Sequence, residues 1–166
     1  MYRQMTVFGL TIDPFTNSPI MILKDSDGEK SMPIWIGLLE ATAIASELEK
    51  VQFSRPMTHD LLKNILDQMG ARVAKVEVCD LKNNTFYALI HLLMGDDKAM
   101  TIDARPSDAI ALALRTASPI FVADDVIERS VKVDAGAKEE VPGDEGKKWT
   151  DILENLDPDD FGKYKM

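Results

Sequence analysis

MTIDARPSDAIALALR, residues 100–115, passes from a strand pattern into a helix pattern within one short stretch. The run AMTIDA at 99–104 is apolar and β-branched, which is typical of a strand. Pro106 disfavours the helical region for Arg105. The run after it is apolar nearly all round, as in a buried helix whose alanines permit close packing. We therefore expect a strand over 99–104 and a buried helix that begins at Ser107.

A second stretch, FSRPMTHDLLKNIL at 53–66, repeats the same order of residue types. Each stretch has an Arg-Pro, then a hydroxyl residue, then an Asp that enters an apolar helical run. Thr58 and Ser107 are the expected N-caps, and Gly70 is expected to end the helix of this second stretch. The expected buried stripe of that helix comprises Leu61, Leu62, Ile65, Leu66 and Met69.

The remaining pattern is interspersed rather than strictly alternating, and hairpin turns dominate it. Further strands are expected at 2–12, 18–24, 32–36, 71–81, 86–94 and 119–122, and a further helix at 38–51. This order favours an α+β fold over a doubly wound parallel one. We expect a mixed, largely antiparallel sheet packed with about three helices, plus a short C-terminal amphipathic helix.

The length of 166 residues is that of one ordinary domain with an appendage. We expect an α+β domain over 1–133, an acidic flexible linker over 134–148 and a helical tail over 149–166. The single cysteine, Cys79, excludes an intramolecular disulfide and favours a reducing compartment. No signal peptide pattern and no long apolar run is visible, so we expect a cytoplasmic protein with no membrane partner.

The charge argues against a non-specific nucleic-acid binder. The net charge is −9, of which residues up to 133 contribute −4 (18 acidic, 14 basic) and the tail −5 (10 acidic, 5 basic). Binding driven by phosphate contacts normally leaves a basic footprint. A nucleic-acid role would therefore depend on a local basic patch, on metal ions, or on an oligomer that gathers its arginines.

The two Arg-Pro stretches supply the candidate site. Arg55 and Arg105, each beside a helix N-terminus, are predicted to bind phosphate together with Thr58 and Ser107. The predicted ligands of a Mg²⁺ or Mn²⁺ ion are Glu40, Asp60, Asp103 and Asp108, because these hard ions prefer oxygen donors. His59 could transfer protons near neutral pH.

Structural explanations stand beside these functional ones. Asp in a first helical turn complements the helix dipole, and an Arg beside two Asp residues often forms an ion-pair strut. His91 reads as a sheet-face or interface histidine, Cys79 as a small packing residue, and Arg115 as a residue at an edge or subunit contact. The motifs of P-loop enzymes, Rossmann dehydrogenases, zincins and serine hydrolases are absent from the sequence.

Three ordered motifs resemble the bifunctional nuclease (BFN) domain family. They are MPIWIGLLEATAI at 32–44, RPMTHDLL at 55–62 and IDARPSDAIALALR at 102–115, followed by PIFV at 119–122. The resemblance covers roughly residues 5–130, and the end of the chain, WTDILENLDPDDFGKYKM, is similar to the C-terminal extension of bacterial members. The positions shared with the family are Glu40, Arg55, Pro56, Thr58, His59, Asp60, Asp103, Arg105, Pro106, Ser107 and Asp108.

The resemblance implies a compact α+β domain, homo-oligomers of two or more copies, and nuclease activity towards DNA and RNA. The leading hypothesis is metal-assisted hydrolysis of phosphodiester bonds in single- or double-stranded nucleic acid, with His59, Asp60 and Asp108 as catalytic residues. The alternative is a non-catalytic, oligomeric binding or regulatory module in which the Arg-Asp cluster is structural.

Overall fold

The computed structural model describes residues 1–96 and 98–134, and it confirms the α+β class. The strands are β1 (Tyr2–Ile12), β2 (Pro19–Asp25), β3 (Ser31–Trp35), β4 (Arg72–Lys82), β5 (Thr85–Leu93), β6 (Ala99–Ala104) and β7 (Ile120–Ala123). The helices of this described part are α1 (Leu38–Leu48), α2 (Thr58–Gln68), α3 (Pro106–Thr116) and α4 (Asp124–Asp134). The predicted tail helix at 149–166 lies outside the described residues, as does the predicted linker beyond Asp134.

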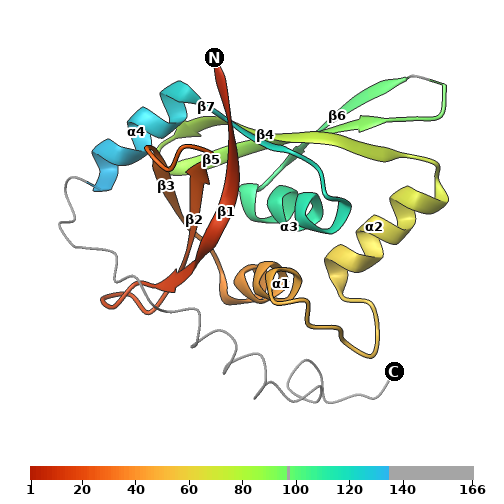
Figure 1. Ribbon diagram of the computed structural model, residues 1–166, viewed down its shortest axis with the longest axis horizontal. Helices are drawn as coiled ribbons and strands as arrows, with labels where there is room; N and C mark the ends of the chain where they lie inside the picture. Colours follow the sequence, from red (N-terminus) through yellow and green to blue (C-terminus); the bar gives the residue numbers. More distant parts are fainter. Residues whose placement is uncertain (97, 135–166) are drawn as a thin grey trace.

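The strands form one mixed sheet in the order β3-β2-β1-β7-β4-β5-β6. Every neighbouring pair is antiparallel except β4 and β7, which run parallel with Val76 opposite Ile120. The short strand β7 therefore joins the N-terminal hairpins to the meander β4-β5-β6 (Figure 1). This arrangement confirms the prediction of a mixed, largely antiparallel sheet.

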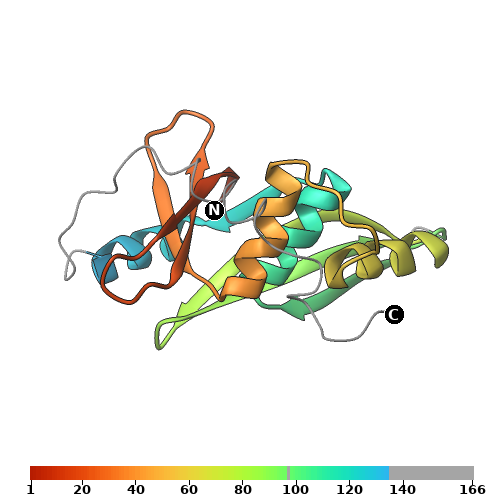
Figure 2. The same cartoon turned by 90° about the horizontal axis from the view of Figure 1, so that it is seen from below.

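Helix α3 is the central helix of the fold. It packs against α1, α2 and the strands β4 and β5, and Figures 1 and 2 show the three helices together on one side of the meander. Ala109, Ile110 and Ala111 have no solvent exposure, and Leu112 and Ala113 are each 1% exposed. These values confirm the prediction of a buried, alanine-rich helix, whose small alanine side chains let neighbouring elements pack closely against it.

Helix α2 differs from its sequence-based prediction. Leu62 and Leu66 pack against the core, but Leu61, Ile65 and Met69 are 54%, 46% and 62% exposed, and no residue of this helix is buried. The prediction of a five-residue buried stripe is wrong because α2 lies at the edge of the helical layer, where one neighbour, α3, covers only part of its apolar face. Gly70 ends the helix with φ +67°, as predicted.

Helix α4 was not expected from the sequence. It follows β7 directly, and its first turn carries Asp124 and Asp125, which complement the positive end of the helix dipole. Val126 and Ile127 are 0% and 2% exposed in the core. The helix contacts β3, β4 and β7, away from the three helices that surround the candidate site (Figure 1).

Candidate functional site

The first turns of α1, α2 and α3 line one pocket with a volume of ≈ 250 Å³. The helices contribute Glu40, Thr58 and His59, and Asp108 respectively, and Arg105 lies at the start of α3. Backbone N–H groups at helix N-termini and the helix dipole both favour anions. The pocket therefore combines three positive helix ends with one exposed guanidinium.

A chain of four side chains crosses this pocket. His59 Nε2 donates a hydrogen bond to Asp108 Oδ1 at 2.9 Å. Arg105 Nε donates to Asp108 Oδ2 at 2.7 Å, and a terminal nitrogen of Arg105 lies 2.8 Å from Glu40 Oε1. The side chain of His59 is 12% exposed and that of Arg105 is 65% exposed. The pocket thus holds an oriented imidazole beside a solvent-facing guanidinium.

The charge state of Asp108 decides which nitrogen of His59 carries the proton. Burial raises the pKa of Asp108, but hydrogen bonds from Arg105 and His59 outweigh burial and hold this pKa below its ordinary value. An ionised carboxylate accepts hydrogen bonds and cannot donate them. His59 Nε2 therefore carries a hydrogen, and in the neutral ring Nδ1 is the basic nitrogen.

Asp60 takes part in a different interaction from Asp108. Arg115 Nε donates to Asp60 Oδ1 at 2.7 Å, and its other nitrogens donate to the carbonyl oxygens of Ala111 and Ala43 at 2.9 and 3.0 Å. The side chain of Arg115 is only 4% exposed, so it does not lie at an edge as the sequence suggested. Arg115 instead ties α1, α2 and α3 together and forms an ion-pair strut with Asp60, whereas the strut expected from the sequence involved the arginines of the two Arg-Pro motifs.

Local helix geometry explains why the carboxylates look alike in the sequence. Glu40, Asp60 and Asp108 each occupy the third position of their helix, where a negative charge complements the dipole. Asp60 Oδ2 also accepts a hydrogen bond from the N–H of Met57, the residue that precedes α2. A carboxylate at the third position therefore stabilises the start of each of these helices. What separates the strut from the pocket is the cation that each carboxylate contacts.

The predicted N-caps, Thr58 and Ser107, are wrong. Met57 and Arg105 are the N-cap residues, and neither start has a side-chain cap hydrogen bond. Pro106 occupies the first helical position because its fixed φ suits that position, and Arg105 before it is extended at φ −70°, ψ 144°. Thr58 lines the pocket with an exposed side chain, whereas Ser107 is 6% exposed and buried.

The structure places the other two predicted site residues apart from the pocket. Asp103 lies in the exposed strand β6, opposite Leu89. Its neighbour Ile102 pairs with Ile90 of the core face, so Asp103 points to the other face of the sheet. Arg55 is exposed in the segment before α2 and lines a neighbouring hollow.

The four predicted metal ligands therefore do not assemble into one group. Among the described residues, no three His, Cys, Asp or Glu side chains lie close enough together to hold a metal ion. Glu40 and Asp108 are the two members that meet, on either side of Arg105. Metal binding at this site remains a prediction that concerns these two carboxylates.

Gly37 is a site residue that the sequence reading missed. A Cβ atom on this residue would lie 2.2 Å from Oε2 of Glu40, so the absence of a side chain lets Glu40 fold back over the start of α1. The signal was the spacing G-x-x-E, in which the side chain of the third helical residue folds back onto the N-cap residue that precedes the helix. Arg115 was misplaced because its long-range partners carry no local signal.

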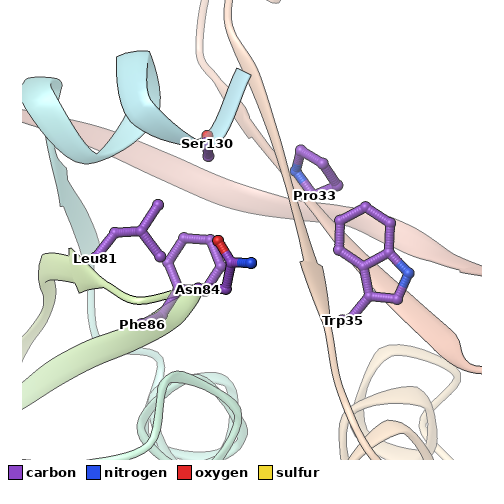
Figure 3. A pocket seen from close by; sticks show the side chains of 6 residues that line it. All are labelled: Pro33, Trp35, Leu81, Asn84, Phe86 and Ser130. Carbon is purple, nitrogen blue, oxygen red and sulfur yellow. The ribbon is translucent and has the colours of Figure 1, made fainter. Parts of the chain in front are cut away.

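A further cavity of ≈ 310 Å³ lies between β3, the β4-β5 hairpin and α4. Its lining residues are Pro33, Trp35, Leu81, Asn84, Phe86 and Ser130 (Figure 3). None of these side chains is an acid, a base or a cation. This cavity therefore lacks the groups that phosphoryl chemistry requires, and the pocket at the three helix starts is the candidate site.

Comparison with known proteins shows the family of the chain. The model of the bifunctional nuclease domain matches residues 21–134, which contain the whole pocket. The chain belongs to the bifunctional nuclease domain family. No helix of the described residues is long and apolar enough to span a membrane.

Two kinds of relative are similar to the chain. An uncharacterized protein of Mycobacterium tuberculosis is 35% identical over 163 residues, which cover 95% of this chain and 97% of that protein. Bifunctional nuclease 2 of Arabidopsis thaliana is 31% identical over 105 residues, covering 61% of this chain and 32% of its own length. Bifunctional nuclease 1 of the same plant is 30% identical over 107 residues, 63% of this chain and 33% of its own. The chain thus matches the bacterial relative along nearly its whole length, and the plant proteins over about a third of theirs.

Proposed function

We propose that the chain is a nuclease that hydrolyses phosphodiester bonds of DNA or RNA in the pocket of Glu40, His59, Arg105 and Asp108. The observation that carries the proposal is the oriented His59–Asp108 pair beside the exposed guanidinium of Arg105. The names of the plant relatives support it, because those proteins are called bifunctional nucleases.

His59 is the general base in this proposal. Asp108 holds Nε2–H, so Nδ1 is free of that hydrogen bond and can take a proton from the attacking water. The water oxygen then forms a bond to phosphorus, the bond to the leaving ester oxygen breaks, and solvent supplies the proton for this oxygen. Asp108 orients the imidazole and stabilises its protonated form, as the carboxylate does in other His-Asp pairs.

Arg105 and the helix starts bind the phosphate in this scheme. Arg105 uses Nε for Asp108 and one terminal nitrogen for Glu40, and the described residues offer no hydrogen-bond acceptor to its other terminal nitrogen. A guanidinium and the N–H groups of helix first turns both complement phosphate oxygens. The charge that develops on these oxygens during hydrolysis is therefore stabilised by groups already in place.

Glu40 and Asp108 are the residues that would hold a divalent ion. They come from two helices, approach the same guanidinium, and offer the carboxylate oxygens that Mg²⁺ and Mn²⁺ prefer. Mg²⁺ commonly uses one or two carboxylates and completes its shell with water and substrate phosphate. Such an ion would supply Lewis-acid polarisation of the phosphate.

Two observations favour a second candidate function, a binding module without catalysis. The guanidinium of Arg105 already contacts two carboxylates, and the net charge of −9 disfavours tight binding to nucleic acid. Under this alternative the four side chains are a surface ion-pair network that recognises a small anionic ligand or a partner. Homo-oligomer formation is compatible with both functions, and light scattering on the full chain would measure it.

A matched pair of histidine variants tests the proposal. Purified wild-type protein is incubated with single- and double-stranded DNA and RNA in Mg²⁺, in Mn²⁺ and in EDTA. His59→Gln should lower the cleavage rate by about 10²–10⁴-fold, and EDTA should lower it if Glu40 and Asp108 bind an ion. His91→Gln, in strand β5 and outside the lining of the pocket, is the control. Equal activity of His59→Gln and wild type would refute this active site, and binding without cleavage would support the second candidate.

A further inference from the structure

A second hollow borders the candidate active site. Its volume is ≈ 350 Å³, and Ser46 and Phe53 line both this hollow and the pocket of His59. The hollow follows the segment between α1 and α2, where Gln52, Ser54 and Arg55 line it. A substrate long enough to leave the first pocket past Ser46 and Phe53 would therefore enter the second.

The charges of this hollow leave Arg55 uncompensated. Of its two acidic lining residues, Asp60 is paired with Arg115 at 2.7 Å and Glu47 with Lys50 at 3.0 Å. Arg55 is exposed and has no carboxylate within ion-pair distance among the described residues. The charged residues that line the hollow sum to zero, and the guanidinium of Arg55 is the one among them without an ion-pair partner in the described part of the chain.

Pro56 restricts the backbone of Arg55. It disfavours the helical region for Arg55, which is exposed at a bend in the segment between α1 and α2. Gln52, Ser54 and Asn64 line the same hollow with side chains that both donate and accept hydrogen bonds. A guanidinium together with neutral polar groups matches the phosphate and sugar of a nucleotide.

We propose that Arg55 binds a second phosphate of a nucleic-acid strand, the one adjoining the phosphate held at Arg105. This proposal rests on the proposed nuclease function and refines its substrate class. The substrate is a strand with at least two successive phosphates, since a single phosphodiester reaches Arg105 but leaves the hollow of Arg55 empty. Arg55 and Arg105 then have separate roles, although both precede a proline in similar motifs.

Two substrates of different length separate the roles. Bis(p-nitrophenyl) phosphate contains one phosphodiester, and a single-stranded DNA dodecamer spans both hollows. For each variant, kcat/KM for the dodecamer is divided by kcat/KM for bis(p-nitrophenyl) phosphate. In Arg55→Gln this ratio should fall about tenfold, because one charged contact to the dodecamer is lost. The change should appear in KM for the dodecamer. The dependence of log KM on log salt should become shallower by about 0.7, the value for one phosphate contact on a single strand.

The control is Arg72→Gln, which removes another exposed arginine without an ion pair among the described residues, at the start of β4. It should leave the ratio at the wild-type value. An unchanged ratio in Arg55→Gln would overturn the proposal. If the wild type cleaves neither substrate, the nuclease proposal fails separately. The phosphate site at Arg55 is then tested by dodecamer binding, measured by fluorescence anisotropy. Weaker binding by Arg55→Gln would support the second phosphate site, and equal binding or no binding by the wild type would overturn it.

Discussion

His59 Nε2 lies 2.9 Å from Asp108 Oδ1, and this hydrogen bond joins the first turn of α2 to the first turn of α3. The next residue in the chain, Asp60, binds Arg115 in the last turn of α3. Two adjacent residues of one motif thus reach opposite ends of the same helix. The first contact lies in the open pocket, and the second is largely buried and fixes how the helices pack.

The contact of Asp60 with Arg115 should contribute to stability rather than catalysis. Asp60→Asn leaves a buried guanidinium without its charged partner, and a hydrogen bond between charged groups contributes about 1.5–3 kcal/mol. The lower end applies because Asp60 is 36% exposed, so the melting temperature should fall by about 3–6 °C. Asp67→Asn, which removes an exposed pair with Lys63 on the same helix, is the control. Equal melting temperatures for the two variants would refute the strut.

The lowered pKa of Asp108 predicts a specific pH dependence of stability. A carboxyl group with a depressed pKa stabilises the fold above its ordinary value of 3.8, and this contribution is lost as the pH falls through the lower folded-state value. The difference in unfolding free energy between wild type and Asp108→Asn should therefore be constant near neutral pH and shrink below about pH 4. Urea denaturation at a series of pH values measures it. A difference that does not shrink in acid would show that Asp108 is not held in its ionised form.

Gly37→Ala tests the position of Glu40. The added Cβ would meet Oε2 of Glu40 at 2.2 Å, and the carboxylate should swing away from Arg105. Because the clash involves the end of a flexible side chain, the melting temperature should change little. If the nuclease proposal holds, kcat/KM should fall by about 10–100-fold, since small displacements at an active site are costly. Gly9→Ala, where a Cβ meets no atom within 4 Å, is the control, and wild-type activity in Gly37→Ala would contradict the role of Glu40.

His91 should matter for stability but not for nuclease activity. It donates a hydrogen bond from Nε2 to Glu77 Oε2 at 2.7 Å, and Glu77 is 7% exposed. Burial raises the pKa of Glu77, but hydrogen bonds from Lys75 and His91 outweigh burial and lower it, so Glu77 is an ionised, partnered carboxylate. His91→Ala should lower the melting temperature by about 4–8 °C, through about 2 kcal/mol. His91→Gln keeps a donor and should lose less, and an equal loss in both variants would refute the hydrogen bond as the cause.

The sequence predicted the elements that depend on local pattern. The buried helix α3, the strands β4, β5 and β6 and the glycine at the end of α2 follow from apolar spacing and from backbone preferences of single residues. The N-caps were misplaced by one or two residues because hydroxyl side chains and prolines give competing helix-start signals. The apolar face of α2 was overestimated because its spacing indicates an amphipathic helix but not how much of its face a neighbour covers.

The sequence by itself determined that carboxylates lie in the first turns of the helices, where they complement the dipole, and that Arg-Pro precedes a helix for steric reasons. Only the tertiary structure decided which carboxylate meets which cation. Asp60 and Asp108 occupy equivalent places in similar motifs, yet one is held by the buried Arg115 and the other by the exposed Arg105 and by His59. The physical reason is that the contacts of Asp60 with Arg115 and of Asp108 with His59 span 55 and 49 residues, so they depend on how the helices pack and not on local spacing.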